Sequence, residues 1–151
     1  MLLEKGITGF FEYGYPSIPE LDYTAFQRMC YAFRNRQWQM TGILRPDHRN
    51  YFYAHFQGCY STGQREKQEV YILQNKYYPI VAMTKELSLY EKVFIDITDP
   101  FLSIMDGELI SAEILNKAFH DSQHHLSDAE LQQIQYWKPV SVGNIIFNEW
   151  D

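Results

Sequence analysis

The sequence predicts an α+β fold: an antiparallel β-sheet of four to six strands with helices packed on it. The middle of the chain holds short runs of β-branched and aromatic residues, separated by turn residues. No helical pattern interrupts these runs, which favours antiparallel pairing over βαβ units. Helical patterns stand before and after them. Because 151 residues are the length of one domain, we expect residues 1–151 to form a single domain with its own core.

The first third of the chain predicts a β-rich opening followed by one helix. Residues 6–14 combine glycine with aromatic and β-branched residues, and they end at a turn with two prolines, which cannot continue a ladder. Either Asp22 or Thr24 can then serve as a helix N-cap. Apolar residues follow at helical spacing and predict an amphipathic helix over residues 22–35. Its apolar positions are Phe26, Met29, Cys30 and Phe33.

Five strands are predicted in the middle of the chain. Residues 46–50 have the composition of a hairpin connection between the first two strands. In the last strand the alternation is regular, and it places Val93, Ile95 and Ile97 on one face. The strands are expected at Met40–Leu44, Tyr51–Gln57, Val70–Gln74, Tyr78–Met83 and Glu91–Ile97.

The last third of the chain is predicted to be helical. Ser111 stands before one helical segment, and Ser127 with Glu130 forms a capping box before another, which Pro139 ends. Ser141 can cap a short final helix, although a glycine two residues later weakens it and leaves a strand as the alternative. The two longer helices are expected near residues 111–120 and 127–137.

Composition and charge exclude several classes of protein. The net charge of −6 opposes binding to nucleic acid or to an anionic membrane, so we expect neither as a direct partner. The longest apolar runs, such as residues 80–83, fall far short of the ~20 residues that span a bilayer. Residues 1–6 lack the features of a signal peptide, and the two cysteines form no CxxC. We therefore expect a cytoplasmic protein in which Cys30 and Cys59 are reduced thiols.

No known catalytic or cofactor motif is present. His120, His124 and His125 form an HxxxHH pattern that suits zinc only on a continuous helix, whereas the intervening residues resemble an exposed connection. The two cysteines lack the sequence context of known nucleophiles, although His48 or His55 could pair with either. We expect a non-enzymatic protein with no metal and no cofactor.

Charge is unevenly distributed along the chain. Residues 24–49 contain five arginines and one acid, a net charge of +4, whereas residues 86–130 contain ten acids and two lysines, a net charge of −8. Within the acidic half, residues 96–108 carry four acids and no base. These acids either are solvated above inward-packed apolar neighbours or bind a basic partner protein. The four candidates for partner binding are Asp96, Asp99, Asp106 and Glu108.

The basic segment offers an alternative function. Arginine binds phosphate and carboxylate groups through paired hydrogen bonds. A pocket between the aromatic sheet and this segment would therefore suit a small anionic ligand or the substrate of an enzyme. Its candidate residues are Arg34, Arg36, Arg45 and Arg49.

The C-terminal residues 136–151 carry a family resemblance. They read Trp-x-Pro, then Val-Gly, then Ile-Phe-Asn-x-Trp-Asp at the chain end. This tail resembles those of small bacterial immunity proteins, which accompany the secreted toxins of contact-dependent inhibition and other polymorphic toxin systems. The resemblance implies a non-enzymatic inhibitor that binds one cognate toxin domain, often a nuclease, and occludes it. It transfers no catalytic or binding residue, and the apolar tail itself is expected to dock into the core.

Overall fold

The computed structural model describes residues 1–14, 16–33, 38–58, 68–88, 91–98, 101–121 and 123–150. It has the predicted α+β fold, with a six-stranded, largely antiparallel sheet and helices packed on it. None of the helices in these residues has the length and apolar character needed to cross a membrane.

The described residues form eight strands: β1 (Leu2–Leu3), β2 (Trp38–Leu44), β3 (Tyr51–Gly58), β4 (Gln68–Asn75), β5 (Ile80–Thr84), β6 (Phe94–Ile95), β7 (Glu108–Leu109) and β8 (Gln123–His124). The main sheet runs in the order β2-β3-β4-β5-β6, with every neighbouring pair antiparallel. β7 pairs with β5 in parallel, and β1 pairs with β8 in a separate parallel ribbon.

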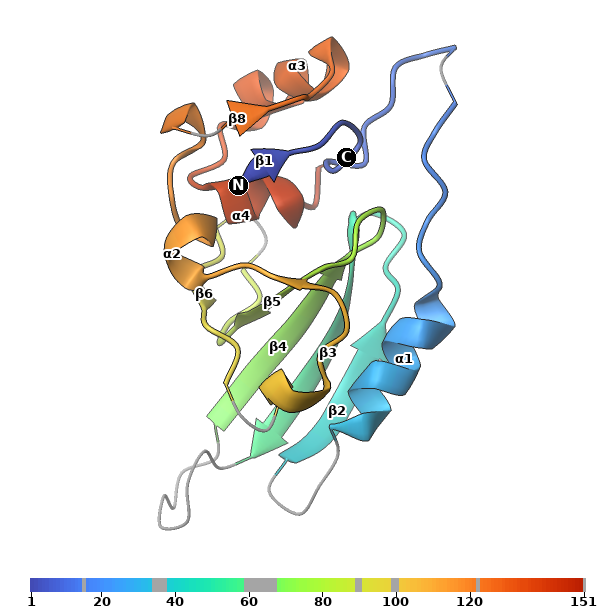
Figure 1. Ribbon diagram of the computed structural model, residues 1–151, viewed down its shortest axis with the longest axis vertical. Coiled ribbons are helices and arrows are strands. Elements are labelled where there is room, and N and C mark those ends of the chain that lie inside the picture. Colours follow the sequence, from blue (N-terminus) through green and yellow to red (C-terminus); the bar gives the residue numbers. More distant parts are fainter. Residues whose placement is uncertain are drawn as a thin grey trace.

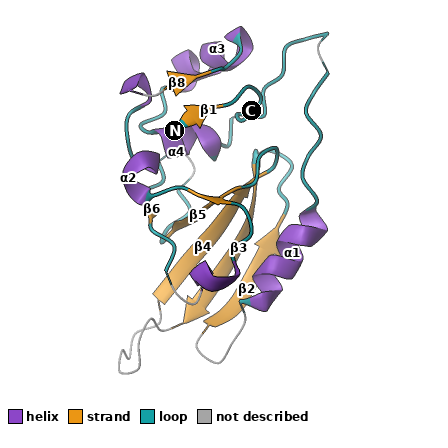
Figure 2. Cartoon of the chain, in the orientation of Figure 1, coloured by secondary structure: helices purple, strands orange, loops and turns teal. Residues whose placement is uncertain are grey.

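The α-helices in the described residues are α1 (Tyr23–Ala32), α2 (Ala112–Leu115), α3 (Asp128–Trp137) and α4 (Val142–Ile146). In Figure 1 the sheet fills the lower half of the molecule and α1 lies beside β2. α3, α4 and both chain ends lie above the sheet. Figure 2 shows that loops connect much of this upper part, where regular strands are short.

Each face of the sheet contributes to a hydrophobic core of its own, so there are two cores. Alternate residues of β3 point to opposite faces. Phe52 and Phe56 pack with α1 and with the 3-10 turn at residues 101–104, whereas Tyr51 packs with α4 and the chain end. Since each face has its own core, every residue of β5 is buried.

The predicted strand at Glu91–Ile97 is wrong in length, and Val93 does not join Ile95 and Ile97, which pack on the core of Phe52 and Phe56. Only β6 pairs with the sheet, and Val93 is 73% exposed. The buried residues are instead Lys92 and Phe94, because Phe94 packs on Phe147 and Lys92 is drawn inward by an ion pair described below.

The predicted β-rich opening at residues 6–14 is also wrong. The backbone turns there, and Gly6 and Gly9 adopt positive φ angles that favour glycine. The backbone N–H groups of Gly6 and Thr8 donate to the buried carboxylate of Glu130, at 2.9 and 3.2 Å, rather than to a neighbouring strand. A side chain from α3 thus takes the place of a ladder partner.

The predicted helix caps are confirmed, but one helix is shorter than expected. Asp22 is the N-cap of α1, and Ser111 is the N-cap of α2. α2 ends after one turn at Asn116, whose side chain pairs with both backbone groups of Phe94 at 2.9 and 3.0 Å. This contact to β6 explains why the helix does not continue to residue 120.

The remaining two helices follow their predicted caps. The capping box of Ser127 and Glu130 opens α3, and Ser141 caps α4, so the tail is a helix rather than a strand. The tail docks into the core as expected: Ile145, Ile146 and Phe147 are fully buried.

Close packing around α4 requires glycine at position 143, so Gly143 does not weaken this helix. A Cβ atom at this position would lie 2.6 Å from Cδ2 of Phe94 and 2.9 Å from the carbonyl oxygen of Leu115. The absence of a side chain therefore lets α4 approach both β6 and α2.

We expect Gly143→Ala to lower the free energy of unfolding by about 1–3 kcal/mol, the usual range for overpacking, although alanine favours helices. Gly42→Ala is the matched control, because no atom lies within 4 Å of the added Cβ. It should change stability by less than about 0.5 kcal/mol. Urea denaturation measures both, and equal effects would contradict the packing argument.

Candidate functional site

Three of the four predicted partner-binding acids lie along the β5 edge of the sheet, and all three are exposed. β6 and β7 both pair with this edge, and Asp96 follows β6 while Glu108 begins β7. Asp106 stands just before β7. Asp99 falls outside the described residues. The structure therefore brings these segments to one edge of the sheet.

The three acids are held in different ways. Asp96 accepts a hydrogen bond of 2.8 Å from the backbone N–H of Ala112, at the start of α2. The carboxylates of Asp106 and Glu108 form no ion pair with any residue that the structure describes. Asp96 thus has a structural contact, whereas the other two carboxylates are available to a partner.

A groove of about 520 Å³ runs between α1 and the loop of Asp106. The Asp106 backbone N–H lies 3.5 Å from the sulfur of Met29 and closes one side of it. Arg28 lines the opposite wall. The basic and acidic segments of the sequence therefore meet at this groove.

The arginines of the alternative site are only partly brought together. Arg34 and Arg36 fall outside the described residues. Arg45 forms an exposed ion pair with Glu20. Arg49 donates to the Tyr51 hydroxyl at 3.2 Å and lines a polar cavity of about 240 Å³.

The structure places the histidines of the HxxxHH pattern in different elements. His124 lies in β8 and His120 in a 3-10 turn, so the two do not stand one turn apart on a continuous helix. His125 lies 3.5 Å from a carboxylate oxygen of Glu4. No group of three possible metal ligands occurs among the residues that the structure describes.

The structure places one of the two cysteines, and it is not accessible as a nucleophile. Cys30 is fully buried in α1, and burial raises the pKa of its thiol. Cys59 falls outside the described residues. The His55 ring stacks on Tyr71 at 4.4 Å, and its Nδ1 lies 2.5 Å from the Thr41 hydroxyl.

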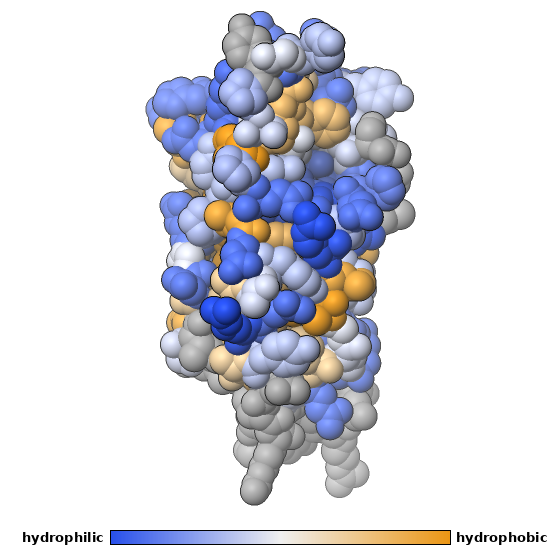
Figure 3. Space-filling view, turned by 90° about the vertical axis from the view of Figure 1, so that its right-hand side faces the viewer, coloured by the Kyte–Doolittle hydropathy of each residue, from blue (hydrophilic) through white to orange (hydrophobic). Residues whose placement is uncertain are grey.

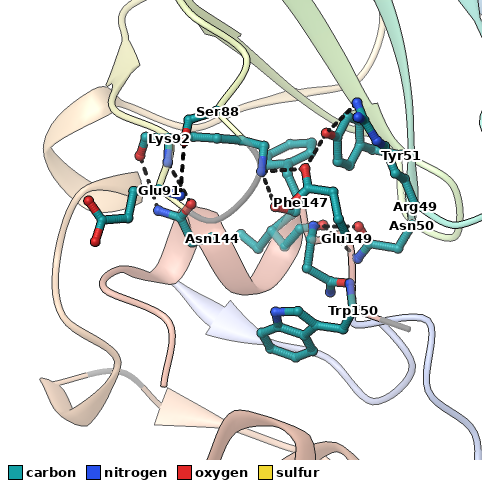
Figure 4. A network of polar contacts seen from close by, with 12 residues as sticks. Arg49, Asn50, Tyr51, Ser88, Glu91, Lys92, Asn144, Phe147, Glu149 and Trp150 are labelled. Atoms are coloured by element: carbon teal, nitrogen blue, oxygen red, sulfur yellow. Dashed lines mark hydrogen bonds and ion pairs between the residues drawn. The ribbon is translucent and has the colours of Figure 1, made fainter. Parts of the chain in front are cut away.

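A buried charged network, which the sequence did not reveal, joins the chain end to the sheet (Figure 4). The Lys92 ammonium lies 2.5 Å from a carboxylate oxygen of Glu149 and 3.3 Å from the carbonyl of Phe147. The Tyr51 hydroxyl donates to the same Glu149 oxygen. The side chains of Lys92 and Glu149 are 1% and 10% exposed.

The electrostatics of this network follow from its burial. Burial lowers the pKa of Lys92, and the neighbouring Glu149 partly opposes that change. The pKa of Tyr51 is raised, mainly by burial and secondly by the charge of Glu149. Each group is bonded to another member of the network, and the Lys92 and Glu149 side chains are almost hidden from solvent, so the contacts hold the chain end against the sheet. The available sequence signal was a lysine within an apolar, strand-like run and a glutamate within an apolar tail.

The side of the molecule shown in Figure 3 has no single dominant hydrophobic patch. That side is mostly hydrophilic, with hydrophobic residues in small separate groups. Comparison of the chain with family models, with curated proteins and with solved structures finds no match.

We expect Glu149→Gln to lower the free energy of unfolding by about 3–5 kcal/mol at pH 7, because it leaves the buried Lys92 charge unpaired. The pKa of Lys92 is below its unfolded value, so the unfolded chain binds more protons and stability rises with pH. Loss of Glu149 lowers the pKa of Lys92 further. The difference in free energy of unfolding between the natural chain and the variant should therefore shrink between pH 7 and 9.5, and urea denaturation across this range measures that difference.

The matched control is the double variant Lys92→Met with Glu149→Gln. It removes both charges and should recover most of the lost stability. A double variant as unstable as the single one would show that Glu149 acts through some other contact.

Thiol labelling tests the burial of Cys30. In a Cys59→Ser variant, we expect an aromatic disulfide reagent to label Cys30 only as fast as the protein unfolds, since the thiol is buried and protonated. Full labelling in denaturant confirms that the thiol is intact. Labelling of the folded protein at the rate of a free thiol would contradict the buried position.

Proposed function

We propose that this chain is a non-enzymatic binding protein, an immunity protein that neutralises a cognate toxin domain by stoichiometric binding and occlusion. The observation that carries the proposal is the pair of exposed carboxylates, Asp106 and Glu108, which form no ion pair with any described residue. The resemblance of the C-terminal tail supports it independently. In this proposal the chain acts in the cytoplasm.

The acidic edge suits a basic partner. A nuclease must bind phosphate groups and therefore carries basic residues around its active site. Carboxylates fixed at one edge of a sheet imitate the negative charge of those phosphate groups. They speed association with a basic partner and help to select it. Occlusion then needs only a stable complex, without any chemistry from this chain.

The buried charges support binding over catalysis. Lys92 and Glu149 neutralise each other inside the protein, and the Tyr51 hydroxyl donates to Glu149, so the three side chains anchor the tail. A catalytic group must instead reach a reacting atom of the substrate. The groups with perturbed pKa values are thus used by the fold, and the exposed acids remain for a partner.

The alternative, a small-anion site, is supported by one observation. Lys76 is 3% exposed, lines the polar cavity with Arg49, and donates to the carbonyl of Pro46 at 2.5 Å. Glu20 and Asp47 line the same cavity and oppose an anion there. An increase in melting temperature with phosphate-containing metabolites would favour this alternative.

The first experiment is co-expression with the C-terminal toxin domain encoded immediately upstream, followed by purification and titration. We expect a one-to-one complex and restored growth. The charge reversal Asp106→Lys with Glu108→Lys should weaken the complex at least tenfold, about 1.4 kcal/mol, because it replaces attraction by repulsion.

The matched control is Glu86→Lys, which reverses an exposed acid beyond the other end of β5. It should change affinity less than twofold. The proposed function fails if no complex forms and toxicity is undiminished. The proposed acidic surface fails if both variants bind equally well.

A further inference from the structure

A polar side chain at the floor of the groove has no partner. Gln74 lies in β4, paired in register with Phe52 and Val81, whose side chains belong to the core beneath α1. It is therefore a polar residue at an apolar position of the alternating pattern. Its exposed fraction is 9%, and its amide forms no hydrogen bond with any residue that the structure describes.

The Gln74 amide is open to the groove rather than sealed in the core. Among the described residues, the buried polar atoms without a partner are Nε2 of His55 and Oγ1 of Thr84, so the amide of Gln74 keeps access to solvent. That access is through the groove, which Gln74 lines. Because it has no partner within the described residues, this amide is free to hydrogen-bond with a group that enters the groove.

The charges around the groove favour a cation. Asp22 on one side and Asp106 on the other line it, against the single guanidinium of Arg28, and Glu108 adds a further negative charge next to the loop. Arg28 forms no ion pair with a described residue. The groove itself thus carries one excess negative charge.

The groove is shaped before any partner arrives. Gly107 has a φ of 123°, and a Cβ there would lie 2.5 Å from the carbonyl oxygen of Pro79, so the loop needs glycine to approach β5. The Glu108 N–H donates to that oxygen at 2.6 Å. The loop carrying Asp106 is therefore fixed opposite α1, which lowers the entropic cost of binding.

We propose that this groove receives one arginine side chain of the partner protein, and this inference rests on the proposed function. The arginine stem packs against the apolar walls formed by Phe26 and Met29. Its planar guanidinium has donors for the Gln74 amide oxygen and for the Asp106 carboxylate together. A lysine ammonium is compact and strongly hydrated, so it fits this combination less well.

The test uses the co-expressed complex and three variants of the full chain. Gln74→Met removes the amide and keeps the length of the side chain. Ala25→Arg places a competing cation on the groove wall, and Ala32→Arg makes the same change on α1 at an exposed position outside the groove. We expect the first two to weaken the complex at least tenfold and the third less than twofold, with circular dichroism confirming that each variant is folded.

Arg28→Gln gives a result of opposite sign. It removes the one cation that repels the incoming guanidinium, so we expect the complex to tighten severalfold. A tenfold weakening would show that the groove holds an anionic group, and would overturn the proposal. Arginine substitutions in the toxin should identify one residue whose loss is not additive with Gln74→Met.

The outcomes separate this inference from the proposed function. If the unmodified chain forms the complex and the groove variants bind equally well, the partner does not enter the groove, and the immunity function stands. If the unmodified chain forms no complex with the toxin domain, both are overturned.

Discussion

The fold depends on a cluster of buried asparagines that attaches both chain ends to the sheet. Asn50 and Asn75 each donate to the carbonyl oxygens of Ile7 and Ile146, at distances of 2.7–2.9 Å. Asn148 donates from its backbone to the Asn50 side chain and from its amide to Thr8. Buried carbonyls outside regular ladders need such partners, because an unpaired one is costly. Irregular terminal segments can therefore be buried here.

The position of the chain end then determines the rest of the upper core. With Asn148 fixed, Glu149 reaches Lys92 and Tyr51, and Phe147 packs on Phe94. These contacts pull β6 against the sheet and expose Val93, contrary to the alternating pattern. The same inward pull leaves the acidic segments on either side, at Asp96 and Asp106, on the outside of the β5 edge.

Local signals predicted the fold well, and distant contacts limited the prediction of the site. The caps Asp22, Ser111 and Ser141 act within a few residues, so the sequence reveals them. The Tyr51–Glu149 contact joins residues 98 apart, and the Asp106–Met29 contact joins residues 77 apart. No pattern in the sequence encodes such neighbours. The acidic segment could be predicted because charge is unevenly distributed along the sequence. The groove beside Asp106 became visible only in the structure.

The contrast between buried and exposed charges is the strongest argument for a binding role. Lys92 and Glu149 are paired because a lone buried charge would destabilise the protein by several kcal/mol, roughly 3–5. Asp106 and Arg28 line the same groove and Glu108 follows its loop, yet none of the three forms an ion pair with described residues. Since exposed pairs contribute only about 0–1 kcal/mol, the fold loses little by leaving them apart. In the proposed function, the attraction of the two carboxylates for a cation is used by the partner, where desolvation makes it stronger.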